Sequence, residues 1–203
     1  MYKKWCALIL TTYFMKFIFK SASLFFVASI VLLQSCTYEK PEIPKPETNY
    51  PEAIEAIIIN KCATAGCHNE QSKAGASGLN LETFEKLFEG GNGGAVVIPF
   101  RDDFSTMLYY TNTDSSKGLV LKPTMPVNGT PLSADEYETL RSWIANGAPD
   151  KNGFVKFSDN PSRRKYYVTN QGCDVVSVFD AKTNLVMRMK DVGNTSAVES
   201  PHC

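Results

Sequence analysis

Between residues 50 and 150, apolar residues recur at the three- and four-residue spacing that places them on one face of a helix. A first helix is predicted from near Pro51 to Lys61, because proline is tolerated in a first turn. Two short helices are predicted within residues 79–91 and 105–110, the former closed by glycines. Ser133 and Glu136 form a capping box that opens a last helix, which ends at Gly147.

The stretch between the third and the last of these predicted helices has a different composition. Residues 118–132 contain three prolines, which suit neither a helix nor a central strand. This stretch is therefore predicted to be a loop, and Met125 lies in its middle.

From residue 163 onward the apolar pattern changes to a period of two. KYYVTN, DVVSVFD and NLVMRMK are rich in β-branched and aromatic residues and are separated by turn residues. The chain is thus predicted to fold as an all-α region of short helices and long loops, followed by a β-rich segment.

Composition narrows the functional classes. The 203 residues include 21 basic and 21 acidic ones, and no basic stripe with interleaved aromatic residues is present. Nucleic acid is therefore not expected as a partner.

The first 36 residues contain four lysines and no acid, and an apolar run from Leu24 to Leu33 precedes Cys36. This arrangement is typical of an export signal, and the run is shorter than the roughly 20 residues of a membrane-spanning helix. The ending LLQSC resembles a bacterial lipoprotein signal, although Gln34 is unusual there. That resemblance implies lipidation of Cys36 and a tethered protein in the cell envelope, either on the periplasmic face of a membrane or at the cell surface.

A Pro-rich segment at residues 37–49 reads as a tether, so residues 50–150 are expected to form one domain and residues 151–203 a second region. Export places thiols in an oxidising compartment. Of the six cysteines, only Cys62 and Cys67 form a close pair, and His68 follows directly.

Three chemistries are compatible with this C-x4-C-H motif. Zinc requires about four ligands, and the motif supplies at most three, with His202 the only other histidine. A disulfide needs no histidine. Covalent haem uses all three residues, two thiols for the porphyrin vinyl groups and the imidazole for the iron, although the usual gap is two residues. Spacing alone leaves disulfide and haem both open.

The surrounding residues resemble the small c-type cytochrome domains of planctomycete and Bacteroidetes exported proteins. The resemblance spans most of residues 54–149 and is carried by INKCATAGCH at 59–68, GLNL at 78–81, GGNGGAVVIP at 90–99, residues 105–109, the T-M-P of 124–126 and W-I-x-x-G-A at 143–148. Phe100 departs from the family, which often has glycine there.

This resemblance implies one covalent haem c, bound through Cys62 and Cys67, with His68 and Met125 as axial ligands. The position of Met125 in a proline-rich loop, in a region without a second histidine, also favours a ligand role over core packing. Its rival Met107 lies on the apolar face of a predicted helix, where packing is the better interpretation. Two axial ligands leave the iron no open position, so an electron carrier rather than a catalyst is expected in this portion.

The β-rich segment resembles one repeat of the YVTN family of β-propellers, through YVTN at 167–170, VSVFD at 176–180 and Val192-Gly193, with Pro201-His202 fitting the start of a next repeat. Because one blade cannot bury its own faces, a longer protein with further blades is expected. The redox partner is not identified by the sequence. Two alternatives remain: an electron-entry domain of a larger propeller oxidoreductase, and a surface binding or scaffold lipoprotein without haem.

Overall fold

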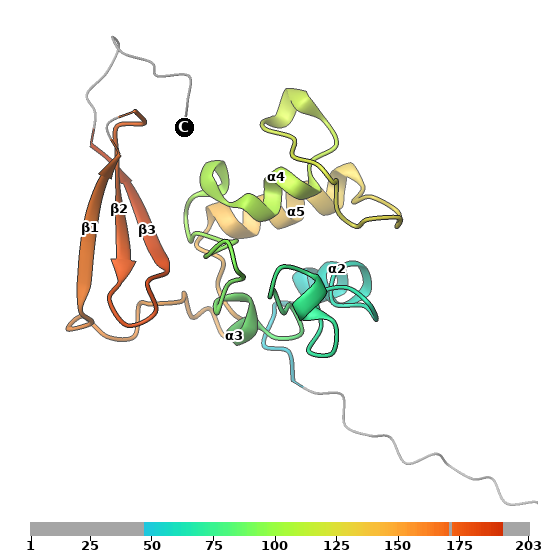
Figure 1. Cartoon of the computed structure of the whole chain (residues 1–203), viewed down its shortest axis with the longest axis horizontal. Helices are drawn as coiled ribbons and strands as arrows, with labels where there is room; N and C mark the ends of the chain where they lie inside the picture. The colour runs from blue at the N-terminus through green and yellow to red at the C-terminus, as the bar shows by residue number, and fades with distance from the viewer. Residues whose placement is uncertain (1–46, 171, 193–203) are drawn as a thin grey trace, which may run out of the picture. The chain divides into compact units, whose positions relative to one another are not determined.

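The computed structural model describes residues 47–170 and 172–192, all within one compact unit that begins at Pro46 (Figure 1). The export signal, Cys36, most of the tether and the residues after Val192 lie outside the described residues. Short helices occupy the first part of this region, and a small antiparallel sheet that does not close on itself follows. The predicted change from helices to strands is confirmed.

All four predicted helices are present, and three short 3₁₀ turns join them. The α-helices are α2 (Glu52–Lys61), α3 (Phe84–Leu87), α4 (Thr106–Thr111) and α5 (Ala134–Ala145). The 3₁₀ turns are η1 (Lys73–Gly75), η2 (Asp102–Phe104) and η3 (Ser115–Lys117), and periodicity did not predict them. Such turns are too short to show an apolar repeat.

The two polar N-caps explain where α5 and α3 begin. At α5 the capping box forms as predicted: Glu136 N donates to Ser133 Oγ at 3.2 Å, and Ser133 N donates to Glu136 Oε2 at 2.7 Å. At α3 the Thr83 hydroxyl accepts from Lys86 N at 3.2 Å, so the helix starts only after Thr83. Residues 79–82, which the pattern included in this helix, are not helical.

The apolar core gathers around the aromatic ring of Tyr50. This ring meets Phe84 and Trp143 edge to face, with centroids 6.3 and 6.4 Å apart. Its hydroxyl donates to the carbonyl oxygens of Leu81 and Thr83, so the buried polar atom is satisfied. The buried core comprises Tyr50, Ile54, Ile57, Ile58, Leu81, Phe84, Leu87, Phe88, Val97, Met107, Leu108, Leu132, Tyr137, Leu140, Trp143, Ile144 and Ala148.

Residues 47–49, which the sequence assigns to the tether, contact the helical region. Phe84 N donates to the Thr48 carbonyl at 2.8 Å, and Lys151 N donates to the Asn49 carbonyl at 2.9 Å. Glu47 also pairs with Lys151. The beginning and the end of the helical region are therefore joined at this point.

Phe100 adopts a backbone conformation that glycine adopts more easily. Its φ is +68°, a left-handed conformation that costs a non-glycine residue about 1 kcal/mol or more. The ring is 51% exposed and lies against Gly147, where an added Cβ would come within 2.6 Å of it. Gly147 itself has φ +99° and ends α5, so two rare conformations meet here.

The sheet has the order β1-β2-β3, formed by Lys165–Asn170, Val175–Asp180 and Val186–Asp191, with antiparallel neighbours (Figure 1). Tyr166 pairs with Phe179 across β1 and β2, and their rings stack with centroids 4.9 Å apart. Alternation of apolar residues had predicted all three strands.

Within the described ranges, no helix is both long enough and apolar enough to cross a membrane.

Candidate functional site

The C-terminal end of α2 places the first cysteine. Ile54, Ile57 and Ile58 bury one face of this helix in the core, and Cys62 caps its end, with its amide donating to Ile58 O at 2.9 Å. The preceding Lys61 forms a 2.7 Å ion pair with Glu136 of α5. The end of α2 is thus held from two sides, and the half-buried Cys62 packs against the core.

Backbone hydrogen bonds fold the four residues between the cysteines into a tight turn. Cys67 N donates to Thr64 O at 3.0 Å, and His68 N donates to Cys62 O at 3.1 Å. The side chain of Asn69 donates to Thr64 O at 3.0 Å, and the Ser72 hydroxyl donates to Cys67 O at 2.6 Å. The structure therefore brings Cys62, Cys67 and the backbone of His68 together despite the longer gap.

The state of the two thiols bears on the three chemistries left open by the motif. Both Cys62 and Cys67 are free thiols, not joined to each other. Among residues 47–170 and 172–192, no three His, Cys, Asp or Glu side chains gather in a way that could hold a metal ion. Within these ranges, the arrangement thus supplies two thiols available for covalent attachment and no cluster of three ligands that zinc could use.

The environment of Cys62 favours its neutral form. Burial, and less strongly the negative charge that Cys67 can carry, raise the pKa of the Cys62 thiol to about 11, against a smaller opposing effect of Lys61. The thiolate is the reactive form of cysteine. In the folded chain, Cys62 therefore needs a partner that activates it or brings the reacting group close.

This environment gives a pH-dependent prediction for the chain before any group is attached. Because the folded pKa lies above the unfolded one, the stability that comes from the neutral thiol is complete below the unfolded pKa and is lost as pH rises toward about 11. Near pH 8.5, iodoacetamide should modify folded Cys62 at least roughly tenfold more slowly than the same thiol in urea. Peptide mass spectrometry measures both rates, and equal rates would contradict a buried Cys62.

His68 is oriented by a backbone carbonyl. Its half-buried ring places Nδ1 3.4 Å from the oxygen of Leu79, which can only accept, so the proton of the neutral ring belongs on Nδ1. Burial lowers the pKa of His68, and the Leu79 carbonyl opposes this shift weakly. Within the described part of the chain, Nε2 has no hydrogen-bond partner. The lone pair of Nε2 is therefore available to coordinate a metal ion.

Met125 lies in the predicted proline-rich loop, which α4 anchors. Met125 N donates to Tyr110 O at 2.7 Å, and Leu121 N donates to Tyr109 O at 2.9 Å. The Met125 side chain is half-buried, and exposed apolar side chains flank it, Leu119 at 52% and Val127 at 49%. Hydrogen bonds to α4 therefore hold the backbone on both sides of Lys122 and Pro123, and Met125 is only partly covered.

Met107, the alternative methionine, lies in α4 with only 9% of its surface exposed and belongs to the apolar core. Packing accounts for it, as predicted. The aromatic residues Phe84, Phe88, Tyr137 and Trp143 are buried in the same core, and Tyr109 is half-buried.

Sequence reasoning did not single out three buried asparagines that shape the site. Asn69 spans the turn between the cysteines, and Asn80 lies beside the Leu79 carbonyl. Asn112 donates to the carbonyls of Gly118 and Leu119 in the loop that leads to Met125. Asparagine usually lies at the surface or in a turn, so the sequence does not indicate that these three are buried. Their burial is visible only in the tertiary contacts.

The comparisons with known proteins bear on one segment of the chain. No curated protein and no solved structure matches the chain. Residues 65–119 match the family model described as Planctomycete cytochrome C, and this segment contains Cys67, His68, α3 and α4. Over residues 65–119 the chain is therefore similar to a cytochrome c domain of that family.

Proposed function

We propose that the helical region binds haem c covalently and transfers single electrons. Cys62 and Cys67 supply the two thioethers, and His68 and Met125 are the axial ligands of the iron. The observation that carries this proposal is the turn that brings two free thiols to the backbone of His68, whose imidazole Nδ1 is bonded to Leu79 O. The match of residues 65–119 to a cytochrome c family, whose domains imply haem c, supports it.

The residues present fit this prosthetic group by their donor chemistry. Covalent haem needs two thiols and a neutral imidazole, and residues 62–68 contain all three groups. Within the described residues, Nε2 of the imidazole has no hydrogen-bond partner. The thioether of Met125, in a proline-rich loop, completes the set, and methionine favours ferrous iron. When bound, haem supplies reversible one-electron exchange between ferric and ferrous iron.

The protein's own contribution is attachment, orientation and exclusion of water. The isoleucine face of α2 and the aromatic core beside it keep the cysteine turn against an apolar surface. With both axial positions taken by side chains, no site remains for a substrate on the iron, which favours electron transfer over substrate chemistry.

Absorption spectroscopy tests the function directly. The chain is produced in a host with a cytochrome c maturation system and purified. We expect a pyridine haemochrome spectrum of c type with one haem per chain, and a redox titration that follows a one-electron curve. A matured sample without a haemochrome band would leave a thiol-bearing binding module as the better interpretation.

We also propose that the chain is exported and anchored by lipid at Cys36. The support is the basic N-terminal region, the apolar run and the LLQSC ending, all outside the described residues. In a bacterial host, metabolic labelling with radioactive palmitate should label the wild-type chain and not the Cys36→Ser variant. Equal labelling of the two would contradict lipidation at this residue.

A second candidate function is the electron-entry domain of a larger propeller oxidoreductase. The exposed apolar residues of the sheet favour it: on β1, Tyr167 is 66% exposed and Val168 41%, and Val192 beyond β3 is 60% exposed. A propeller blade buries such faces against neighbouring blades. Sequencing the genomic region downstream decides the matter: further repeats with a cofactor-binding histidine would support this candidate, and their absence would oppose it.

A further inference from the structure

The segment that contains Leu79 runs alongside the segment that contains His68. Leu81 N donates to His68 O at 2.8 Å, and the Leu79 carbonyl faces His68 Nδ1. Residues 79–81 thus contact His68 through both its backbone and its ring. The position of this extended segment decides whether the ring keeps its hydrogen bond.

Asn80 lies between these two contacts in the sequence, and hydrogen bonds of its side chain hold it in place. It is only 4% exposed, and its Nδ2 donates to Glu70 Oε2 at 2.8 Å and to Glu82 Oε2 at 3.3 Å. Its Oδ1 accepts from Glu82 N at 2.9 Å. All the hydrogen-bonding groups of the Asn80 amide are therefore used within a few residues of His68.

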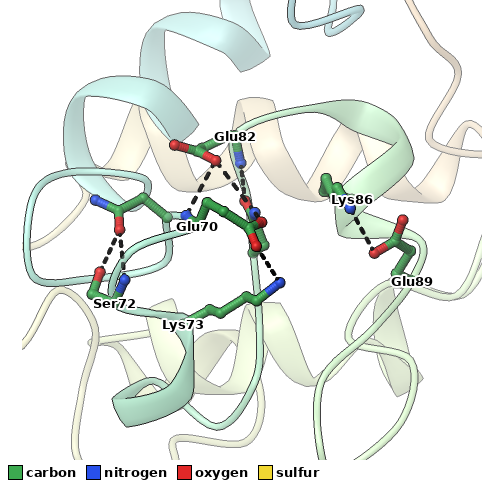
Figure 2. A network of polar contacts seen from close by, with 8 residues as sticks. Glu70, Ser72, Lys73, Glu82, Lys86 and Glu89 are labelled. Atoms are coloured by element: carbon green, nitrogen blue, oxygen red, sulfur yellow. Dashed lines mark hydrogen bonds and ion pairs between the residues drawn. The ribbon is translucent and has the colours of Figure 1, made fainter.

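The carboxylates that hold Asn80 are themselves fixed, as Figure 2 shows for Glu70, Glu82 and Lys73. Glu82 Oε2 accepts from Glu70 N at 3.1 Å, and Lys73 Nζ lies 2.6 Å from Glu70 Oε1. The network therefore joins residues 70–73, directly after His68, to residues 80–82, directly after Leu79. It bridges the two segments at the point where the ring meets the carbonyl.

A carbonyl at Nδ1 has two effects on an imidazole that binds a metal through Nε2. It fixes the tautomer and the rotation of the ring, and it raises the basicity of the ligand. A more basic ligand favours ferric over ferrous iron. A group that holds the carbonyl in place therefore acts on the metal without touching it.

We propose that Asn80 is a positioning residue that holds the Leu79 carbonyl against Nδ1 of His68. In the free chain this fixes the tautomer of His68. In the matured protein it also lowers the reduction potential of the iron, an effect that rests on the function proposed above. The tautomer itself does not depend on that function.

The test compares Asn80→Ala with Asn112→Ala in the full chain as purified. Asn112 is a matched control for the proton exchange of His68, because it is a buried asparagine that bonds to the carbonyls of Gly118 and Leu119, remote in sequence from His68. The midpoint potential of Asn80→Ala is compared with wild type alone, because the loop that Asn112 holds leads to Met125. Nitrogen-15 NMR of the histidine rings reports which nitrogen carries the proton. The chain has two histidines, so a His68→Gln variant assigns the signals.

We expect wild type and Asn112→Ala to show a protonated Nδ1 on His68. In Asn80→Ala, exchange of this proton should be roughly five- to tenfold faster, the factor that loss of one hydrogen bond of typical net strength implies. In haem-loaded protein, Asn80→Ala should raise the midpoint potential above that of wild type. Unchanged exchange and an unchanged potential in Asn80→Ala would overturn the proposal.

A second set of variants guards against misfolding of Asn80→Ala. Asn80→Asp replaces the donating amide by a third carboxylate beside Glu70 and Glu82, and it should speed the exchange of the His68 proton. Adding Glu70→Gln restores a donor and an acceptor in exchanged positions, and the exchange should return toward the wild-type rate. Failure of this rescue in a folded double variant would also overturn the proposal.

The two proposals fail in different ways. A wild-type chain without a haemochrome band contradicts the haem function, while the NMR comparison still decides the role of Asn80. A haem-loaded wild type, with an Asn80→Ala variant that equals wild type in both the exchange of the His68 proton and the midpoint potential, contradicts the positioning role alone.

Discussion

Replacing both Cys62 and Cys67 by alanine is expected to abolish covalent haem attachment. The two thiols are the free cysteines of the described residues, and a turn closed by the His68 N to Cys62 O hydrogen bond brings them together. Without them no thioether can form, and a haem held only by axial ligands dissociates in denaturant. Haem staining on a denaturing gel should therefore fall from full intensity to background.

The single variants make this prediction sharper. Cys62→Ala and Cys67→Ala should each retain some stain through the remaining thioether, and the haemochrome band should shift to longer wavelength because one vinyl group stays unsaturated. Undiminished staining of the double variant would show that the thiols do not hold haem. A wild-type chain whose gel mobility changes on reduction, with no stain, would instead support a disulfide.

Replacing Met125 by leucine is expected to remove the sulfur ligand of the iron and open its distal position. The weak absorption band of methionine bound to ferric haem should vanish, and carbon monoxide should bind the ferrous form. The midpoint potential should fall by on the order of 0.1 V or more, because methionine ligation favours ferrous iron.

Met107→Leu is the matched control for Met125→Leu. Met107 lies in the apolar core and is 9% exposed, so this change conserves volume and should cost less than about 1.5 kcal/mol of unfolding free energy. Its absorption band and potential should stay those of wild type. If Met107→Leu lost the band and Met125→Leu kept it, the distal ligand would have to be reassigned to Met107.

Elements with local causes were predictable from the sequence. The capping box at Ser133 predicts α5, and the two-residue alternation of residues 165–190 predicts the three strands. Both patterns depend on groups within a few positions of each other. The Cys62, Cys67 and His68 motif is local for the same reason. The family match over residues 65–119 includes Cys67 and His68 but not Cys62, and it confirms the resemblance to a cytochrome c domain over that segment.

Features that depend on distant parts of the chain were not predictable in the same way. The 3₁₀ turns leave no periodic signal, and α3 is shorter than its apolar pattern because the cap falls at Thr83. The buried amide of Asn80 looks like a surface residue in sequence. Its importance depends on Glu70, ten positions away, and on the fold that buries both the amide and the ring of His68 nearby.

The sequence by itself determined which residue types are available for the chemistry: two thiols, an adjacent imidazole and a thioether in a proline-rich loop. Local hydrogen bonding and side-chain periodicity act over a few residues, so helices, strands and this motif were readable in advance. Only the tertiary structure decided that Met107 is core, that burial raises the pKa of Cys62, and that Leu79 O meets His68 Nδ1. Burial and long-range hydrogen bonds arise when distant segments pack together, and no local pattern encodes them.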